Sequence, residues 1–501
     1  MRAATLILLC VAVAARAVAF TNPVASLDEQ FYLLVGGRLL HGAIPYVNIW
    51  DRKPIGLFLL YALFKLPGGS GVIASHSAAV IFVAATSVIL FWMARRIASD
   101  GSALTAAAIY IVWLNLAGGE TAQAPIFYNL LMAAAVAILL TYKSRAVINK
   151  GNLRSGGCWA MLLCGVSLQI KYSVVFEGLF IGITLISVSW RAGRGKRDLA
   201  IDAALWISIA ALPTIAAGAA YALIGHFHDW VFANITSIAL RGTELPTTTK
   251  SRIIIIAALI APLLLTIPVR RWCEIRPVAE DARRDLSLLD GWSASALLGV
   301  VLFGTWFNHY ALPLFAPLAV SAAPLGGSRF GRFYLAGLLL IGGSAGQYVS
   351  YQHGVNHGNG RDLAAAVDAL KGSKTCIFVY DGYPALYDAT SSCLLTTRPF
   401  PSHLHSLNEG GATGIVQVQE IRRIMASRPE RVVTMEPAYA EENPASREEV
   451  YGVLRREYVE LYRSHVGAHQ LVVFALRKTQ PSWQKQGTKV PPKREEIAHG
   501  Q

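Results

Sequence analysis

The sequence predicts a mainly α-helical polytopic membrane protein with a small C-terminal α/β domain outside the cytoplasm. Of its 501 residues, 54% are hydrophobic and only 15% are charged, which is far more apolar than a typical soluble protein. The apolar residues stand in separate blocks of about 15–22 residues, the length at which a helix spans a bilayer core. After residue 350 these blocks end, and helical patterns alternate with strand-like runs, as is typical of a layered α/β domain.

Eleven of these blocks are predicted to cross the membrane, although 11 to 13 crossings fit the pattern; they are residues 4–20, 72–93, 102–117, 124–142, 157–170, 174–190, 201–223, 253–269, 291–306, 311–325 and 332–350. The run Pro54–Leu66 would reach only about 20 Å as a helix, so we expect it to lie at the interface. Ala17-Val18-Ala19 resembles a signal-peptidase site, but we expect the first block to remain as an anchor.

The basic residues indicate the orientation of this predicted topology. The loops assigned to the cytoplasm contain 17 Lys and Arg residues, and the longer outer loops contain 8. Because Lys and Arg are enriched in cytoplasmic loops, we expect a multi-pass protein of the inner (plasma) membrane with an extracytoplasmic C-terminal domain. This distribution accounts for the net charge of +14 without a nucleic-acid partner.

The chain divides into three predicted parts. Residues 1–350 form a membrane domain with a first outer loop at 21–71, residues 351–477 form the soluble domain, and residues 478–501 are expected to be a disordered tail. In the soluble domain we predict helices at 361–371, 413–427 and 445–456 and strands at 375–380, 431–435, 458–462 and 471–476. Cys376 and Cys393 could form a disulfide there, and no CxxC spacing indicates a zinc or redox motif.

The first outer loop carries an unusual density of charge beside apolar segments. It opens with Asp28 and Glu29 at the start of a short amphipathic helix, and it closes with Asp51 and Lys53 against the next apolar run. Charges in such a position are costly unless water, a partner or a ligand satisfies them. This loop is therefore the principal candidate for a functional site.

Four other outer loops bring polar residues to the same predicted face of the membrane. In chain order they supply Glu120, Lys171 and Tyr172, Arg241, and His309 and Tyr310. Each has a plainer structural explanation, since a lone lysine at a helix end usually extends to the interface and a His-Tyr pair fits an interfacial aromatic belt. Their joint placement on one face favours a shared site.

The stretch Ser26–Tyr61 resembles the first outer loop of the bacterial GT-C glycosyltransferases, the family related to protein O-mannosyltransferases and to the aminoarabinose transferase of lipid A. The shared points are an Asp-Glu pair after the first span, a Gly-Arg segment, and a Lys-Pro before an aromatic-aliphatic run. Further similar segments, in the order found in the family, are LCGVSLQIKYS, Trp230–Asn234, HYALPLFAPLAV and VYDGYPALYDATSSC. The resemblance covers roughly residues 1–400.

This resemblance implies a GT-C-like fold and a transferase that moves a sugar from a polyprenyl-phosphate carrier to a glycan, lipid or protein acceptor outside the cytoplasm. It implies that Asp28 is the catalytic carboxylate, that Glu120 is a second catalytic acid, and that Lys53 contacts the donor phosphate. We expect substrate contacts also from Glu29, Asp51, Lys171, Tyr172, Arg241, His309 and Tyr310. Because Glu120 stands where many relatives have Asp, use of a divalent metal is left open.

The chemistry of such a transfer fits these residue types. A carboxylate can remove the proton of an acceptor hydroxyl, and Lys53, Lys171 or Arg241 could stabilise the departing phosphate. The carrier's tail would lie among membrane lipids, with Pro54–Leu66 as one wall. A lipid-linked sugar flippase or transporter is the main alternative, although such proteins usually hold their charge near the midplane, often between inverted repeats. A membrane scaffold would leave the clustered charges without a role.

Overall fold

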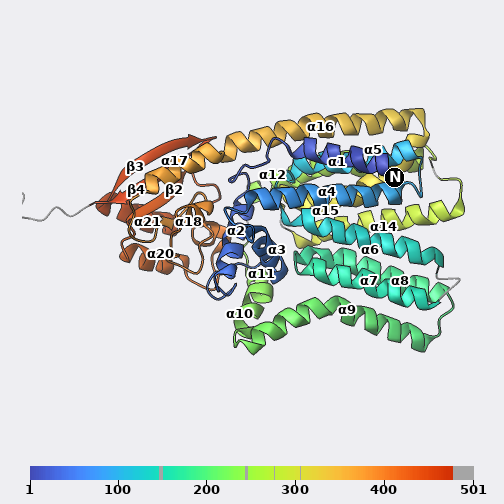
Figure 1. The fold of residues 1–501 in the computed structure, drawn as a ribbon, viewed down its shortest axis with the longest axis horizontal. Coiled ribbons are helices and arrows are strands. Elements are labelled where there is room, and N and C mark those ends of the chain that lie inside the picture. Colours follow the sequence, from blue (N-terminus) through green and yellow to red (C-terminus); the bar gives the residue numbers. More distant parts are fainter. Residues whose placement is uncertain (146–149, 243–245, 276, 305, 478–501) are drawn as a thin grey trace, which may run out of the picture.

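Long helices lie side by side in a bundle in the computed structural model, and the C-terminal α/β region is attached to one end of that bundle (Figure 1). The structure describes residues 1–145, 150–242, 246–275, 277–304 and 306–477. The predicted disordered tail, residues 478–501, lies outside the described residues. The N-terminus lies at the end of the bundle remote from the α/β region (Figure 1).

Eight helical segments of the described residues are long and apolar enough to cross a membrane. Each coincides with a predicted span, and they lie on α4 (Val72–Ala94), α5 (Asp100–Leu114), α6 (Ala124–Arg145), α8 (Val175–Arg191), α9 (Lys196–Leu223), α12 and α13 (Pro246–Leu264 and Thr266–Trp272), α14 (Glu280–Phe303) and α15 (Leu312–Ala322). The fold is therefore mainly helical and built around membrane-spanning elements, as the sequence predicts.

The three remaining predicted spans are also helical, on α1 (Arg2–Arg16), α7 (Lys150–Leu168) and α16 (Arg329–His357). Over their described residues, none of the three meets the length and the hydropathy expected of a span taken alone. A total of eleven crossings stays a prediction. Helix α16 continues past residue 350 to His357, so the predicted domain boundary falls inside a continuous helix.

Two short helices, α2 (Leu27–Leu40) and α3 (Ile55–Lys65), lie at the end of the bundle that faces the α/β region (Figure 1). Helix α3 has 11 residues, and at about 1.5 Å per residue it is too short to cross a bilayer core of about 30 Å. The two helices pack closely, because a Cβ at Gly36 would lie 2.7 Å from the backbone of Tyr61. Glycine at this position is what allows α2 to lie so near α3.

Short helical turns connect the long helices. Between α9 and α12 the chain forms α10 (Phe227–Val231), a π-helical turn (Phe232–Thr236) and α11 (Ser237–Ala239), and 3₁₀ turns occur at Asn115–Ala117, Tyr172–Val174, Asn308–Ala311 and Ala323–Gly327. Such breaks leave backbone groups outside the regular helical pattern, and they direct side chains away from the helix axes. Three of the predicted polar outer-loop groups lie on or beside these breaks.

The soluble region contains one four-stranded sheet with helices packed beside it. Its helices are α17 (Gly360–Leu370), α18 (Ala385–Ala389), α19 (Ser402–His405), a 3₁₀ turn (Leu407–Glu409), α20 (Gln417–Ala426) and α21 (Pro444–Glu457), and its strands are β1 (Phe378–Val379), β2 (Arg431–Glu436), β3 (Tyr458–Val466) and β4 (His469–Leu476). The strand order is β1-β2-β4-β3, with β1 parallel to β2 and the other pairs antiparallel. The helix predicted at 413–427 begins only at Gln417.

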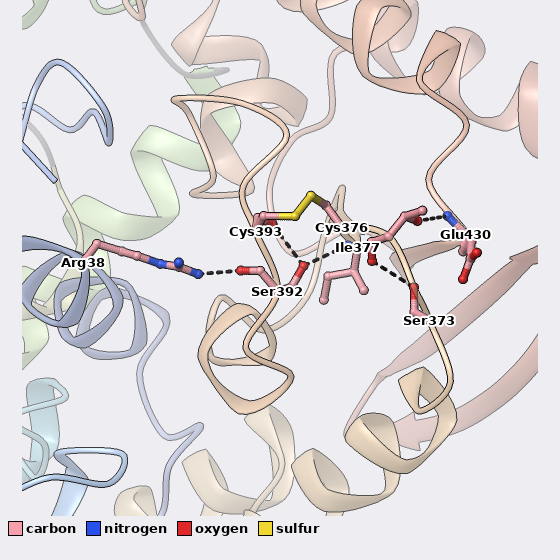
Figure 2. The surroundings of a disulfide bond; sticks show 8 residues. Arg38, Ser373, Cys376, Ile377, Ser392, Cys393 and Glu430 are labelled. Carbon is pink, nitrogen blue, oxygen red and sulfur yellow. Dashed lines mark hydrogen bonds between the residues drawn. A yellow bond between two sulfur atoms is a disulfide. The ribbon is translucent and has the colours of Figure 1, made fainter. Parts of the chain in front are cut away.

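A disulfide joins Cys376 to Cys393 in this region (Figure 2). Nη2 of Arg38 on α2 donates a hydrogen bond of 2.5 Å to the carbonyl oxygen of Ser392, and the backbone N–H of Ile377 donates one of 2.9 Å to Ser392 Oγ. The bond that the sequence left open is therefore present, and it lies beside a contact between the soluble region and α2.

Arginines pair with acids of neighbouring helices at the opposite end of the bundle. One carboxylate oxygen of Asp202 on α9 lies 2.5 Å from Nε of Arg154 and the other lies 2.6 Å from Nε of Arg194, while Nη2 of Arg270 lies 2.5 Å from Oδ2 of Asp290. Asp202 and Arg270 are buried. Because charge-assisted bonds between guanidinium and carboxylate have a fixed geometry, these pairs hold the helix ends together.

Candidate active site

Asp28 lies in the first turn of α2, where the bundle meets the soluble region. The side chain of Ser26 caps this helix by accepting a hydrogen bond of 3.4 Å from the backbone N–H of Glu29, as serine commonly does. The Asp28 side chain is half-buried and makes no ion pair or hydrogen bond with the described residues. It is close enough for its charge to act on Lys53 and Lys171, so a carboxylate without a partner stands near two lysines.

The loop before α3 presents Lys53 to α2. Its Nζ lies 6.0 Å from the ring centroid of Tyr32, and the hydroxyl of Tyr46 donates a 2.8 Å hydrogen bond to its carbonyl oxygen, which fixes the backbone. Burial by itself lowers the pKa of Lys53, but the charges of Asp51 and Asp28 outweigh burial and raise that pKa above its ordinary value. Lys53 is therefore a cation at neutral pH.

Lys171 stands in the break between α7 and α8. Its Nζ lies 3.9 Å from the centroid of the Tyr310 ring, a cation–π contact, and the residue is only 8% exposed. Burial lowers the pKa of Lys171, and the neighbouring charge of Lys53 also lowers it. Within the described part of the chain, neither lysine makes an ion pair. Lysines that form no direct ion pair in such surroundings favour an anionic ligand as a further partner.

Tyr172 ties this break to the loop before α3. Its hydroxyl donates a hydrogen bond to Oδ1 of Asn234 in the π-helical turn, and Nδ2 of Asn234 donates one of 2.7 Å to the carbonyl oxygen of Trp230. The hydroxyl of Tyr46 also lies 3.4 Å from Asn234 Oδ1. The segment from Trp230 to Asn234, which the sequence singled out, therefore holds both lysine-bearing loops.

Arg241 adds a positive charge near Lys53 and Lys171, and the ring of His309 lies in the same group of side chains. Nε of Arg241 lies 3.1 Å from Oε1 of Glu409, a residue of the soluble region. His309 stacks on Phe307 with the ring centroids 5.7 Å apart, and it lies within electrostatic range of Lys171 and Arg241. The structure thus brings together polar residues that the sequence placed on three separate outer loops.

Asp51 is buried between the lysine cluster and the soluble region. The backbone N–H of Arg52 donates a 2.6 Å hydrogen bond to its Oδ1, and Nε2 of His403 lies 4.0 Å from the same oxygen. Burial raises the pKa of Asp51, and the positive charge of Lys53 opposes this only in part. Asp51 is therefore one wall of the cluster and also a contact to the soluble region.

Two predicted acids lie outside the cluster. The carboxylate of Glu29 points into the bundle, where it lies 2.9 Å from Nε2 of His76 and accepts a hydrogen bond of 3.0 Å from the backbone N–H of Ala122. Glu120 is 3% exposed, and its Oε1 lies 2.6 Å from Nδ1 of His353 on α16. Both carboxylates link elements of the fold. A substrate-binding role for Glu29 and a catalytic role for Glu120 stay predictions.

Three residues of the site were not predicted from the sequence: Arg52, His403 and Glu409. Arg52 could have been predicted, since it stands in the charged run beside Lys53. His403 and Glu409 come from the soluble region, and Glu409 is 357 positions from its partner Arg52. No local pattern connects residues so far apart, so the fold alone brings them together.

The cluster combines one carboxylate that has no partner with several cations at the same end of the bundle. Such a combination can accept the proton of a hydroxyl and can neutralise the charge of a departing phosphate. Within the described residues, no group of three or more His, Cys, Asp and Glu side chains is arranged to hold a metal ion.

The overall fold is similar to those of solved membrane enzymes. No family model matches the sequence, and no curated protein matches it significantly. The crystal structure of ArnT from Cupriavidus metallidurans bound to undecaprenyl phosphate matches with a TM-score of 0.59 and 13% identity, over 93% of this chain and 97% of that chain. The apo oligosaccharyltransferase of Archaeoglobus fulgidus matches with a TM-score of 0.51 and 10% identity, over 86% and 69%. The chain has a GT-C-like fold.

Proposed function

We propose that this protein is a membrane glycosyltransferase that moves a sugar from a polyprenyl-phosphate-linked donor to a glycan, lipid or protein acceptor outside the cytoplasm. The observation that carries the proposal is the cluster of Asp28, Lys53 and Lys171, in which neither lysine forms an ion pair with the described residues. The likeness of the fold to ArnT bound to undecaprenyl phosphate supports a phosphate carrier for the donor.

In this mechanism the donor's phosphate binds between Lys53 and Lys171, and the carrier lipid lies in the adjoining bilayer. Asp28 takes the proton of an acceptor hydroxyl while the oxygen of that hydroxyl bonds to the anomeric carbon of the sugar. The bond between this carbon and the phosphate oxygen breaks, and its electron pair leaves with the polyprenyl phosphate. The two lysines stabilise the negative charge that develops on the leaving phosphate.

Chemical analysis of the envelope lipids, glycans and glycoproteins of a strain that lacks the gene tests this proposal. We expect one sugar to be missing from its acceptor and to return when the wild-type gene is restored. A sugar-linked lipid that accumulates in the cytoplasmic leaflet, together with a purified protein that transfers no sugar, would indicate a flippase and refute the proposal.

We propose further that the Asp28 end of the bundle and the soluble region face the extracytoplasmic side of the inner membrane. The basic residues of the inner loops support this orientation, and so does the Cys376–Cys393 disulfide, since disulfides persist in oxidising compartments. In a background without the free cysteines, a cysteine at exposed Glu448 on α21 should react with an impermeant thiol reagent in whole cells. Reaction only after lysis would reverse the orientation.

A further inference from the structure

The soluble region is fastened to the loop that carries Lys53. The backbone N–H of Trp50 donates a 2.8 Å hydrogen bond to the carbonyl oxygen of Thr397, and the ring centroids of Trp50 and His403 lie 4.9 Å apart. His403 also approaches Asp51. The segment just before Lys53 is therefore held by one backbone hydrogen bond and by the side chains of Trp50 and Asp51. The position of this loop therefore depends on a region outside the bundle.

Glu409 makes the strongest of these contacts. Its carboxylate accepts hydrogen bonds of 2.8 and 2.5 Å from Nη1 and Nη2 of Arg52, and it lies 3.1 Å from Nε of Arg241. Its neighbour Asn408 accepts a 3.0 Å hydrogen bond from the backbone N–H of Gly242. Arg52 belongs to the loop before α3 and Arg241 to the segment after α11, so one carboxylate joins two outer loops of the bundle.

The charges of Glu409, Arg52 and Arg241 explain how Glu409 can hold both loops while the site keeps a net positive charge. Burial by itself raises the pKa of Glu409, but Arg52 and Arg241 outweigh burial and lower that pKa to about 2, so the carboxylate is ionised at working pH. A carboxylate in contact with two guanidiniums compensates only part of their charge. Its bidentate contact with Arg52 is directional, and Arg52 is bonded directly to Lys53.

We propose that Glu409 is a positioning residue of the transfer site: it holds Arg52 and Arg241 in place and so fixes the loop that carries Lys53, the residue proposed to contact the donor phosphate. This inference rests on the proposed sugar transfer for its catalytic meaning. It assigns the soluble region an indirect part in donor binding, through a residue that itself touches no substrate.

Replacement of Glu409 by Gln removes the charge and retains the size of the side chain. In the full-length protein, assayed with a polyprenyl-phosphate-linked sugar, we expect KM for the donor to rise about tenfold, since a hydrogen bond to a charged group is typically worth that factor. We expect kcat to change less, because Asp28 is not moved. Glu409→Asp should recover part of the loss, because it restores the charge at a shorter reach.

The matched control is Glu449→Gln. Glu449 also pairs with an arginine of the soluble region, Arg422, with Nη2 2.8 Å from its Oε2, but that pair joins α20 to α21 and does not touch the bundle. We expect this variant to keep the wild-type KM. A donor KM unchanged by Glu409→Gln, or raised equally by Glu449→Gln, would overturn the proposal.

Hydrogen exchange provides a second readout that needs no transfer activity. In Glu409→Gln the amide of Trp50 should exchange faster, because its acceptor Thr397 and the Arg52 contact belong to the same interface, while the paired strands β2 and β4 keep their protection. Faster exchange in β2 as well would indicate unfolding of the soluble region and would overturn the positioning role. If the wild type transfers no sugar but the Trp50 amide still exchanges faster in Glu409→Gln, the proposed function is wrong. The role of Glu409 in holding the loop before α3 is then supported by itself.

Discussion

At the end of the bundle remote from the soluble region, Asp202 compensates Arg154 and Arg194, whereas at the opposite end Lys53 and Lys171 make no ion pair with the described residues. Asp202 is fully buried and Lys171 is 8% exposed, so burial alone does not separate the two ends. The difference is in the partners of these particular residues: Arg154 and Arg194 share the carboxylate of Asp202, whereas Lys53 and Lys171 form no ion pair with the described residues.

This difference separates charges that hold the fold from charges that are available to a ligand. A buried ion pair is strongly destabilised when one partner is removed, because the other charge is left uncompensated. Keeping two lysines without a direct ion pair in such surroundings costs free energy, which a bound anion would offset. Cations without partners are therefore better guides to a binding site than the total charge of a loop.

At the end of the bundle that carries Lys53 and Lys171, replacement of Asp28 by Asn should have the largest effect on sugar transfer. The change keeps the size of the side chain and removes the proton acceptor, so we expect transfer to fall by about 10²- to 10⁴-fold, as is typical for loss of a general base. Donor binding should be largely kept, because the lysines are unchanged. Transfer at a near wild-type rate would exclude Asp28 as the base, and Glu120 would become the next candidate.

The control for this variant is the adjacent residue. Glu29→Gln removes a carboxylate that already has His76 and the Ala122 amide as partners, so we expect a lower melting temperature with a smaller loss of transfer. Each variant removes one negative charge, and the two positions are adjacent in the same helix. Their comparison therefore separates a charge that serves the fold from one that serves the reaction.

Replacement of Lys53 or Lys171 by Ala should have the next largest effect. Each removes a cation from the proposed phosphate site, and we expect the donor KM to rise by about 10- to 100-fold, as for loss of a hydrogen bond to a charged group. The matched control is Lys65→Ala, since Lys65 already pairs with Asp388 at 3.0 Å. An unchanged donor KM in both Lys53→Ala and Lys171→Ala would remove the lysines from the site.

Much of the framework could be predicted because it depends on local pattern. Apolar blocks of spanning length and alternating strands are visible in a short window of sequence, and the spans and strands lie close to the predicted ranges. Helix α2 (Leu27–Leu40) was harder to interpret. It was predicted to be amphipathic, but its polar residue Gln30 is buried and accepts a hydrogen bond from the backbone N–H of Ala385, because the soluble region covers α2.

The candidate site could be predicted only where a residue is unusual for its immediate sequence surroundings. Asp28, Lys53 and Lys171 stood out as charges beside apolar segments, and the structure brings them together. The sequence could not separate Glu120 from them, because its partner His353 lies 233 positions further along the chain. Glu409 was missed for the same reason, since pairs between distant segments follow from the fold.

The smallest effect on transfer is expected at the end of the bundle remote from the soluble region, where Asp202 pairs with Arg154 and Arg194. Asp202→Asn leaves Arg154 and Arg194 without their carboxylate, and we expect a loss of about 3 kcal/mol in the free energy of unfolding, at the low end for a buried pair because Arg154 is partly exposed. The exposed residue Asp198 on the same helix gives the control, since Asp198→Asn should cost at most about 0.5 kcal/mol. The transfer rate per folded molecule should stay at the wild-type value in both variants, because these residues lie at the far end of the bundle. If Asp202→Asn lowered kcat in correctly folded protein, the two ends would be coupled, and the distinction between structural pairs and functional cations without partners would fail.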